Sequence, residues 1–289
     1  MKSDWFLVTA FRRTESGAGE KCMDMKKNKL AIVGCGKLGS IVADALLSGL
    51  LPEYELAGVY SRTMSKAEAL ASRMIGRGLE CRVCAGLDEL IALNPDYIVE
   101  AASPAAMKEL AIPALSSGAS IVTLSIGALA DEKFRCSVEA CARENGARVY
   151  VVSGATGGFD VLRTASLMGG AEAEFFNEKG PDALRGTPVY EDSLQTEQRT
   201  VFSGSASEAI ALFPTKVNVA VAASLASVGP DRMRMSMRST PGFKGDTQRV
   251  EIRNAQVHAV VDVYSATSEI AAWSVVNTLQ NIVSPISFC

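Results

Sequence analysis

The feature that most constrains this chain is a glycine-rich segment that directly follows a short apolar run. Residues 30–33 read Leu-Ala-Ile-Val, the pattern of a parallel strand that is buried on both faces. Residues 34–39 read Gly-Cys-Gly-Lys-Leu-Gly, and Ile41, Ala45 and Leu46 then form an apolar stripe at helical spacing. A GxGxxG motif between a strand and a helix is typical of the first unit of a doubly wound α/β fold.

The spacing of the glycines predicts how this turn is built and what it holds. Gly34 allows a tight turn, Gly36 lets the backbone approach a pyrophosphate, and Gly39 lets the helix pack closely on the strand. The first turn of the helix, at Lys37 and Leu38, presents free N–H groups and a partial positive charge to phosphate. The motif therefore predicts a binding site for a nicotinamide dinucleotide, NADP or NAD. The alternative is a glycine turn that holds no ligand.

The end of the second expected strand indicates which dinucleotide fits. An Asp or Glu at this point would accept from the ribose 2′-hydroxyl and favour NAD, but the sequence has Ser61 and Arg62. Arginine makes charge-assisted hydrogen bonds to phosphate, so this pair favours the 2′-phosphate of NADP, or the use of both dinucleotides. The alternative for Arg62 is a solvated side chain at the start of a helix. Further on, Ala101 and Ala102 follow a strand, and their small side chains leave room for the nicotinamide riboside.

Strands and helices alternate in the first half of the chain, and the pattern changes in the second half. The expected strands of the first half, after 30–33, are 55–60, 97–101, 120–124 and 148–152, and its later helices are 65–74, 104–115 and 131–145. The expected strands of the second half are 200–204, 232–238, 247–253 and 257–263, with helices at 213–225 and 268–282.

These elements together predict a Rossmann-type doubly wound parallel sheet with a second, smaller α+β domain. We expect the dinucleotide-binding domain to span residues 28–127 and a substrate-binding and dimerisation domain to span residues 128–265. Residues 266–289 contain the last expected helix, and residues 1–27, which carry no sustained period, are expected to be a disordered extension.

Composition excludes several classes of function. The formal net charge is −3, which gives no electrostatic case for nucleic acid or an anionic membrane, and no apolar run approaches the roughly 20 residues that span a bilayer. Cys81 and Cys84 form a lone CxxC, which we interpret as two ordinary thiols of a reduced, cytoplasmic protein; a redox or zinc role is the alternative. His258 is the single histidine, so a His-rich metal site is excluded, and we expect a structural or surface role for it and no metal.

Motifs of the second half bring in a resemblance to a known family. Residues 153–160 read Ser-Gly-Ala-Thr-Gly-Gly-Phe-Asp, residues 213–220 read Phe-Pro-Thr-Lys-Val-Asn-Val-Ala, and residues 125–129 read Ser-Ile-Gly-Ala-Leu. With the GxGxxG motif and the Thr-Ser pair before the last helix, these segments resemble the L-aspartate dehydrogenase family over residues 28–289. The resemblance implies NAD(P)-dependent interconversion of aspartate, a small amino acid and dicarboxylate, with its imino acid and oxaloacetate.

The resemblance also implies an assembly and residue roles. It implies a homodimer whose last helix returns to the dinucleotide-binding domain, and it implies that Ala155 and Asn218 contact the cofactor. The family carries its catalytic histidine in a segment that matches residues 246–250 here, and Gln248 stands at that histidine's position. Glutamine donates and accepts hydrogen bonds but has no titratable proton near neutral pH, so it can orient a substrate and cannot act as a general acid.

Three explanations of this departure stay open. Another residue supplies the proton, with Lys216 and Asp160 as candidates; or the substrate differs, as in a related amino-acid-pathway dehydrogenase; or the chain is a non-catalytic dinucleotide-binding sensor or partner subunit. For Lys216 the alternative is a surface lysine, and for Asp160 a helix cap. Arg249 and Lys216 are also candidate partners for a substrate carboxylate.

Overall fold

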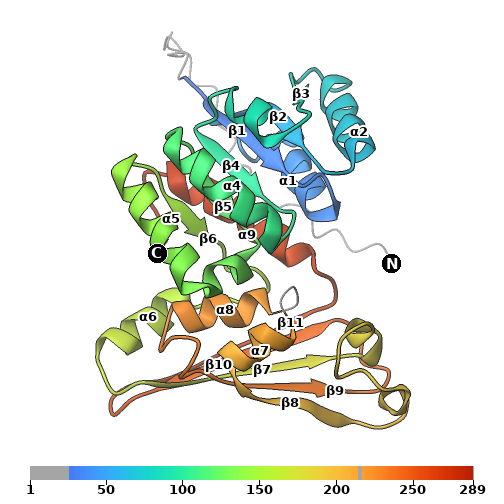
Figure 1. The fold of residues 1–289 in the computed structure, drawn as a ribbon, viewed down its shortest axis with the longest axis vertical. Helices are drawn as coiled ribbons and strands as arrows, with labels where there is room; N and C mark the ends of the chain where they lie inside the picture. The colour runs from blue at the N-terminus through green and yellow to red at the C-terminus, as the bar shows by residue number, and fades with distance from the viewer. Residues whose placement is uncertain (1–25, 214–216, 289) are drawn as a thin grey trace, which may run out of the picture.

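The computed structural model describes residues 26–213 and 217–288, which form two sheets of different kinds. Figure 1 shows the first sheet with its flanking helices in the upper part of the molecule, and the second sheet at the base. A layer of helices lies between them. The disorder expected for residues 1–27 concerns a segment that lies almost wholly outside the described residues.

The first sheet has six parallel strands in the order β3-β2-β1-β4-β5-β6. The order reverses between β1 and β4, so the loops after these neighbouring strands open a crevice at the carboxyl edge of the sheet. The strands are β1 (Asn28–Val33), β2 (Tyr54–Tyr60), β3 (Arg82–Val83), β4 (Tyr97–Glu100), β5 (Ser120–Thr123) and β6 (Val149–Val151). The helices between them are α1 (Lys37–Leu47), α2 (Met64–Ile75), α3 (Leu87–Ile91), α4 (Pro104–Ser116), η1 (Ile126–Ala130) and α5 (Glu132–Glu144).

The apolar run of β1 lies at the centre of this sheet, and its side chains pack on both faces. Leu30 and Ile32 pack in one cluster of buried side chains, whereas Ala31 and Val33 pack in another, on the opposite face. All four side chains are buried, because successive residues of a strand point to opposite faces and both faces carry helices. Burial on both faces of the sheet therefore explains why residues 30–33 are all apolar.

The second sheet has five strands in the order β11-β10-β7-β9-β8 and is antiparallel except between β7 and β9. Helices and buried side chains cover one of its faces. The strands are β7 (Glu172–Lys179), β8 (Arg199–Ser205), β9 (Arg234–Ser239), β10 (Asp246–Arg253) and β11 (His258–Ser265). The helices are α6 (Phe159–Leu167), α7 (Ala206–Leu212) and α8 (Asn218–Leu225), with short 3-10 helices η2 (Pro181–Leu184) and η3 (Asp192–Gln195).

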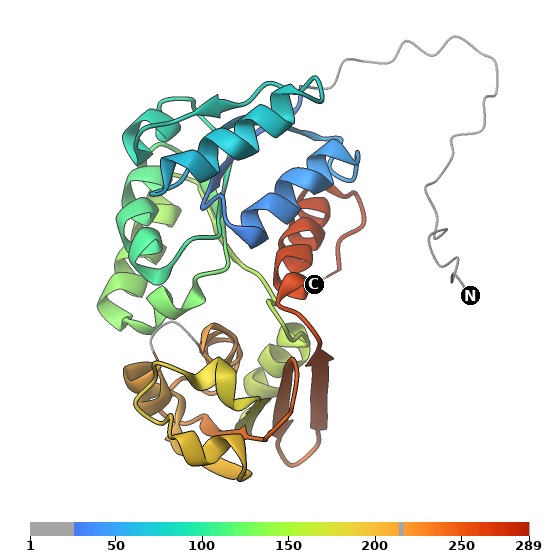
Figure 2. The ribbon, with the colours of Figure 1, turned by 90° about the vertical axis from the view of Figure 1, so that its right-hand side faces the viewer.

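The last helix, α9 (Glu269–Val283), leaves the second sheet and packs against the first domain. Figure 2 shows it beside α1. Leu279 and Val275 join the same buried cluster as Val42 of α1, and the Tyr54 hydroxyl donates to the Leu279 carbonyl at 2.8 Å. The chain therefore returns to its dinucleotide-binding part. Across the described ranges, none of the helices is both long and apolar enough to pass through a bilayer.

Three differences from the expected organisation concern the region around the interdomain cavity. The parallel sheet extends beyond residue 127, since β6 pairs with β5. The helix expected at 213–225 includes residues outside the described ranges; within the described chain, α7 ends at Leu212 and α8 begins at Asn218. The strand β7 was not expected at all, because its sequence, Glu-Ala-Glu-Phe-Phe-Asn-Glu-Lys, carries charges on the face that the helices leave open.

Candidate active site

The glycines of the GxGxxG turn meet the requirements of a pyrophosphate cradle. Gly34 has φ +99°, and a Cβ there would lie 2.7 Å from the Ala101 carbonyl, so the turn needs glycine. A Cβ on Gly39 would lie 2.0 Å from the Gly34 carbonyl oxygen, whereas one on Gly36 would meet nothing within 4 Å. Gly36 therefore leaves open space in front of the backbone, where a phosphate group fits.

The helix that follows this turn leaves its first amide groups available. α1 begins at Lys37, and its N-cap, Gly36, offers no side-chain hydrogen bond to the N–H groups of the first turn. The ammonium of Lys37 lies 2.9 Å from Glu269 of α9, so this side chain is paired at the surface with the last helix. The observed turn and helix end fit a dinucleotide pyrophosphate.

A cavity of about 290 Å³ extends from this turn to the end of β2. Ser61 and Arg62 line it, as expected, and so do Thr63 and Lys66, which the sequence had not singled out. No acidic side chain from this end of β2 lines the cavity within the described chain. The hydroxyls of Ser61 and Thr63 and the cations of Arg62 and Lys66 therefore lie where the ribose 2′ position of a dinucleotide belongs. Glu109 of α4 lines the same cavity.

A second cavity, of about 410 Å³, lies between the two domains. It joins residues that are far apart in the sequence. The expected site residues that line it are Leu38, Ala101, Ala102, Ala155, Asn218 and Gln248. The Asn218 side chain also accepts from the Gly127 amide at 2.9 Å, which connects the start of α8 to the loop after β5. A cavity at the carboxyl edge of a doubly wound sheet, closed by a second domain, is the usual place for a dinucleotide and its substrate.

Gln248 lies in the wall of this cavity with an orientation that its neighbours fix. Its side chain is 6% exposed, and its Nε2 donates to Oδ2 of Asp246 at 2.9 Å. Because a carboxylate only accepts, the amide nitrogen must face Asp246 and the amide oxygen must face the other way. Oε1 of Gln248 is buried and has no hydrogen-bond partner among the described residues, so its acceptor capacity is unused there.

A buried glutamate organises the two loops at the edge of the cavity. Glu100, at the end of β4, is 0% exposed and accepts from the amides of Ala102 and Ser103 at 2.9 and 3.0 Å. It also accepts from the hydroxyls of Thr123 and Ser125 at 2.8 and 3.0 Å. Burial raises the pKa of Glu100 above its ordinary value, and these hydrogen bonds oppose that shift. The carboxyl group therefore connects the loops after β4 and β5.

Two expected catalytic or substrate residues do not line this cavity, and a third lies outside the described residues. Asp160 is exposed in the first turn of α6 and does not line the cavity; the N-cap of this helix is Gly158, so Asp160 is not the helix cap that was its alternative. The expectation that Arg249 is a substrate carboxylate partner is not supported. Arg249 lies on the opposite face of β10 from Gln248, because adjacent strand residues point to opposite faces. Lys216 lies outside the described residues.

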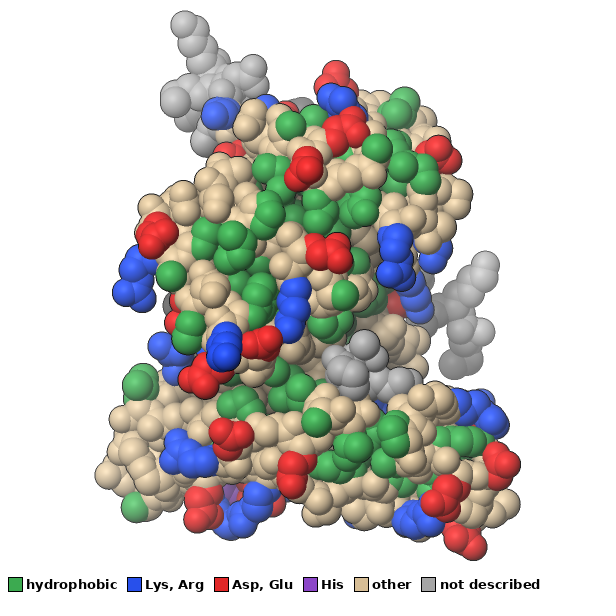
Figure 3. Space-filling model, in the orientation of Figure 1, with side chains coloured by type: hydrophobic (Ala, Val, Ile, Leu, Met, Phe, Trp, Pro, Cys, Tyr) green, Lys and Arg blue, Asp and Glu red, His purple; other side chains and the backbone are tan. Residues whose placement is uncertain are grey.

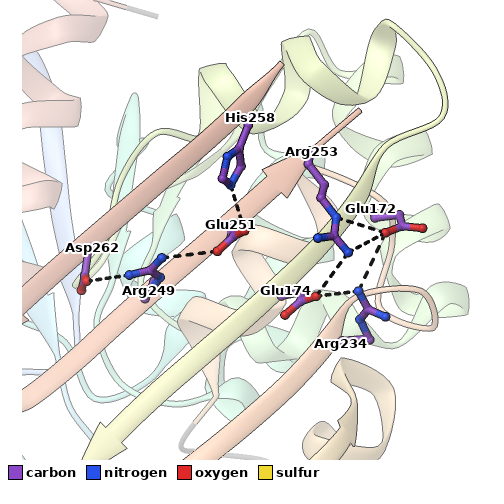
Figure 4. A network of polar contacts seen from close by, with 8 residues as sticks. All are labelled: Glu172, Glu174, Arg234, Arg249, Glu251, Arg253, His258 and Asp262. Atoms are coloured by element: carbon purple, nitrogen blue, oxygen red, sulfur yellow. Dashed lines mark hydrogen bonds and ion pairs between the residues drawn. The ribbon is translucent and has the colours of Figure 1, made fainter. Parts of the chain in front are cut away.

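Figure 4 shows the outer face of the second sheet, to which Arg249 belongs. Arg249 makes ion pairs with Glu251 at 3.4 Å and Asp262 at 3.5 Å, and His258 lies 2.8 Å from Glu251. The hydrogen bond from His258 is the main cause that lowers the pKa of Glu251. His258 is thus a surface residue, as the sequence had indicated. On the side of the molecule seen in Figure 3, acidic and basic side chains are interspersed.

The CxxC cysteines are buried thiols without a disulfide. Burial raises the pKa of Cys81 to about 12 and raises that of Cys84 as well, and it raises the pKa of nearby Cys35 to about 11. These thiols stay protonated near neutral pH, which disfavours a reactive redox pair. Within the described ranges, no group of three or more His, Cys, Asp or Glu side chains could hold a metal ion.

Two charged residues of the cavity wall were missed as site residues in the sequence. Lys179 and Asp246 both line the cavity, and the Lys179 ammonium lies 2.7 Å from Oδ2 of Asp246. Lys179 ends β7, a strand that the sequence pattern did not reveal, and Asp246 begins β10, which pairs with β7. The only signal in the sequence was the position of Asp246 two residues before Gln248.

Comparison with known proteins gives consistent results for both domains. Residues 160–282 match the family described as aspartate dehydrogenase, C-terminal, and residues 34–152 match homoserine dehydrogenase, NAD binding domain. An L-aspartate dehydrogenase of Methanocella arvoryzae is 32% identical over 89% of this chain and 98% of its own length. An L-aspartate dehydrogenase 2 of Bordetella pertussis is 32% identical over 88% and 96% of the two chains.

Solved structures share the same two-domain plan. The crystal structure of aspartate dehydrogenase from Thermotoga maritima has a TM-score of 0.70 and 25% identity, covering 91% of this chain and 99% of that one. A hyperthermophilic archaeal homoserine dehydrogenase in complex with NADPH has a TM-score of 0.59 at 14% identity, covering 88% and 96%, which concerns the fold alone. The expected Rossmann-type sheet with a second α+β domain is confirmed.

Proposed function

This chain belongs to the L-aspartate dehydrogenase family and is an NAD(P)-dependent amino-acid dehydrogenase, and we propose that its substrate is L-aspartate. The reaction interconverts aspartate with iminoaspartate, which water converts to oxaloacetate and ammonia. The dinucleotide, when bound, supplies the hydride donor or acceptor for Cα of the substrate. We assign the pyrophosphate to the turn at residues 34–39 and the nicotinamide end to the wall that contains Ala155 and Asn218.

The observation that carries this proposal is the buried acceptor of Gln248. An unpaired buried polar atom costs about 1–3 kcal/mol, so Oε1 gains most from a ligand that brings a donor to it. The nitrogen of an amino acid, or of its imine, is such a donor. We propose that Gln248 accepts a hydrogen bond from this nitrogen and orients Cα toward the cofactor side of the cavity. Gln248 orients the substrate and takes no proton.

The small residues of the first domain have a role in access. Ala101 and Ala102 line both the interdomain cavity and the cavity at the end of β2. A dinucleotide that extends between the two cavities must pass this point, and larger side chains would narrow it. We propose that these alanines let the cofactor pass from Arg62 toward Gln248, with Glu100 holding their loop in place.

NADP is the dinucleotide that the first cavity favours. Arg62 and Lys66 bring two positive charges to it, and Ser61 and Thr63 bring hydroxyl donors. A 2′-phosphate uses all of these groups, whereas the 2′-hydroxyl of NAD lacks the charge. A homodimeric assembly and a cytoplasmic location stay predictions of the sequence.

The test is turnover measured at the nicotinamide absorbance band. Protein is mixed with NADPH, ammonium and each member of a panel of 2-oxo acids, and the proposal expects the fastest oxidation with oxaloacetate. Faster turnover of another 2-oxo acid would assign the chain to a related amino-acid dehydrogenase. Saturable NADPH binding without turnover across the whole panel would replace the proposal by a non-catalytic binding protein.

A further inference from the structure

A lysine and an aspartate stand in the wall of the interdomain cavity without a role in the function proposed above. Lys179 ends β7 and Asp246 begins β10, and the two residues are direct partners in the antiparallel ladder. The Lys179 ammonium lies 2.7 Å from Oδ2 of Asp246, with the two side chains 12% and 27% exposed. The ion pair is thus withdrawn from bulk water, yet both residues line the cavity.

Asp246 is held by more than the lysine. Its carboxylate also accepts from the side-chain amides of Asn177 and Gln248. The Asn177 amide donates in addition to the Thr247 carbonyl at 2.9 Å, so it is itself anchored to the strand. With donors on both oxygens, the carboxylate has a fixed orientation, and it places the ammonium of Lys179 at a fixed point of the wall.

The ammonium keeps donor capacity beyond this ion pair. It carries three N–H donors, and among the described residues only the pair with Asp246 occupies one of them. Lys179 and Asp246 supply the charged side chains of the cavity wall, as far as the described chain extends. A largely buried ion pair is weak evidence for a stabilising role, because desolvation of both charges offsets their attraction. A ligand that accepts hydrogen bonds from the remaining N–H donors of Lys179 would explain why this pair lines the cavity.

We propose that Lys179 binds a carboxylate of the substrate and that Asp246 is the positioning residue that holds it. This inference rests on the proposed function, which supplies an amino acid or its oxo acid as the ligand. Lys179 donates to the substrate carboxylate, and Oε1 of Gln248 accepts from the substrate nitrogen. The protein thus recognises the substrate with one donor and one acceptor. Of the two carboxylate partners considered from the sequence, Arg249 lies on the other face of β10 and Lys216 lies outside the described residues.

The experiment measures ligand binding and turnover separately. Succinate, a dicarboxylate that cannot react, is titrated calorimetrically into the wild-type protein saturated with NADP, and into Lys179→Met and Lys179→Arg. Lys108→Met is the matched control, because Lys108 makes a comparable pair with Asp131 at 2.9 Å but is exposed and away from this cavity. NADPH affinity, measured in each variant, reports whether the dinucleotide site is intact.

The expected result is a loss of succinate affinity of about 10- to 100-fold in Lys179→Met, the effect of removing a charge-assisted hydrogen bond. Lys179→Arg should recover part of it, and Lys108→Met and all NADPH affinities should be unchanged. Asp246→Asn should weaken succinate binding less than Lys179→Met does. Equal succinate affinity in wild type and Lys179→Met overturns the inference, and so does the absence of succinate binding to the wild type. If succinate binding depends on Lys179 but the protein does not turn over aspartate, the proposed function is wrong and the inference about Lys179 stands.

Discussion

The carboxylate of Glu100 accepts a hydrogen bond from the hydroxyl of Ser125 at 3.0 Å, which joins the loops that follow two neighbouring parallel strands. One of these loops contains Ala101 and Ala102, and the other leads to η1, where the Gly127 amide donates to Asn218 of the second domain. The same buried carboxyl group therefore stabilises the crevice of the first domain and its junction with the second.

Replacing Glu100 by glutamine should destabilise the protein and weaken dinucleotide binding. A glutamine keeps the size but presents an NH2 group toward donors such as the Ala102 amide or the Ser125 hydroxyl, so at least one buried donor loses its acceptor. We expect a loss of about 1–3 kcal/mol in the free energy of unfolding, measured in urea. Glu68→Gln, on an exposed position of α2, is the control. Equal stability of Glu100→Gln and wild type would contradict the role given to this carboxyl group.

Arg62→Ala should change the choice of dinucleotide. We expect the KM for NADPH to rise by about tenfold or more while the KM for NADH changes little, since only NADPH carries the 2′-phosphate. Steady-state kinetics with both cofactors gives the ratio, and Arg77→Ala, on an exposed position after α2, is the control. A parallel rise for both cofactors would show that Arg62 does not read the 2′ position.

Gln248→His should increase turnover, and Gln248→Leu should decrease it. The histidine adds a titratable group at the cavity wall, and general acid–base help contributes about 10²- to 10⁴-fold in rate. The leucine removes the acceptor that we assign to the substrate nitrogen. Both kcat values are measured with saturating NADPH, oxaloacetate and ammonium. Unchanged kcat in both variants would remove Gln248 from the reaction.

Arg249→Ala should leave turnover within about twofold of wild type. This side chain is 44% exposed and pairs with Glu251 and Asp262 on the face of β10 that points away from the cavity. Exposed pairs of this kind contribute about 0–1 kcal/mol to stability, so unfolding should also change little. A large increase in the KM for oxaloacetate would place Arg249 at the substrate after all.

Cysteine labelling should separate buried from exposed thiols. At pH 8, below the raised pKa of about 11 for Cys35 and about 12 for Cys81, both side chains remain protonated and react slowly with iodoacetamide. Exposed Cys136 should react quickly and serves as the internal reference. Peptide mass spectrometry gives the labelled fraction of each. Rapid labelling of Cys81 in the native protein would revive the redox interpretation of the CxxC motif.

The sequence by itself determined the part of this protein whose signals are contiguous. The strand, the three glycines and the start of α1 lie within residues 28–47, so the dinucleotide turn follows from local pattern. The absence of an acid beside Arg62 was likewise visible, as was the Gln248 position, through the resemblance of its segment to a known family.

Only the tertiary structure decided which side chains meet at the substrate cavity. Lys179 and Asp246 are 67 positions apart and come together because β7 and β10 pair in one register. The same register, with its alternation of faces, turns Gln248 toward the cavity and Arg249 toward solvent. Sequence spacing alone fixes neither the pairing of distant strands nor which of their two faces the helices cover, because both depend on how the whole core packs.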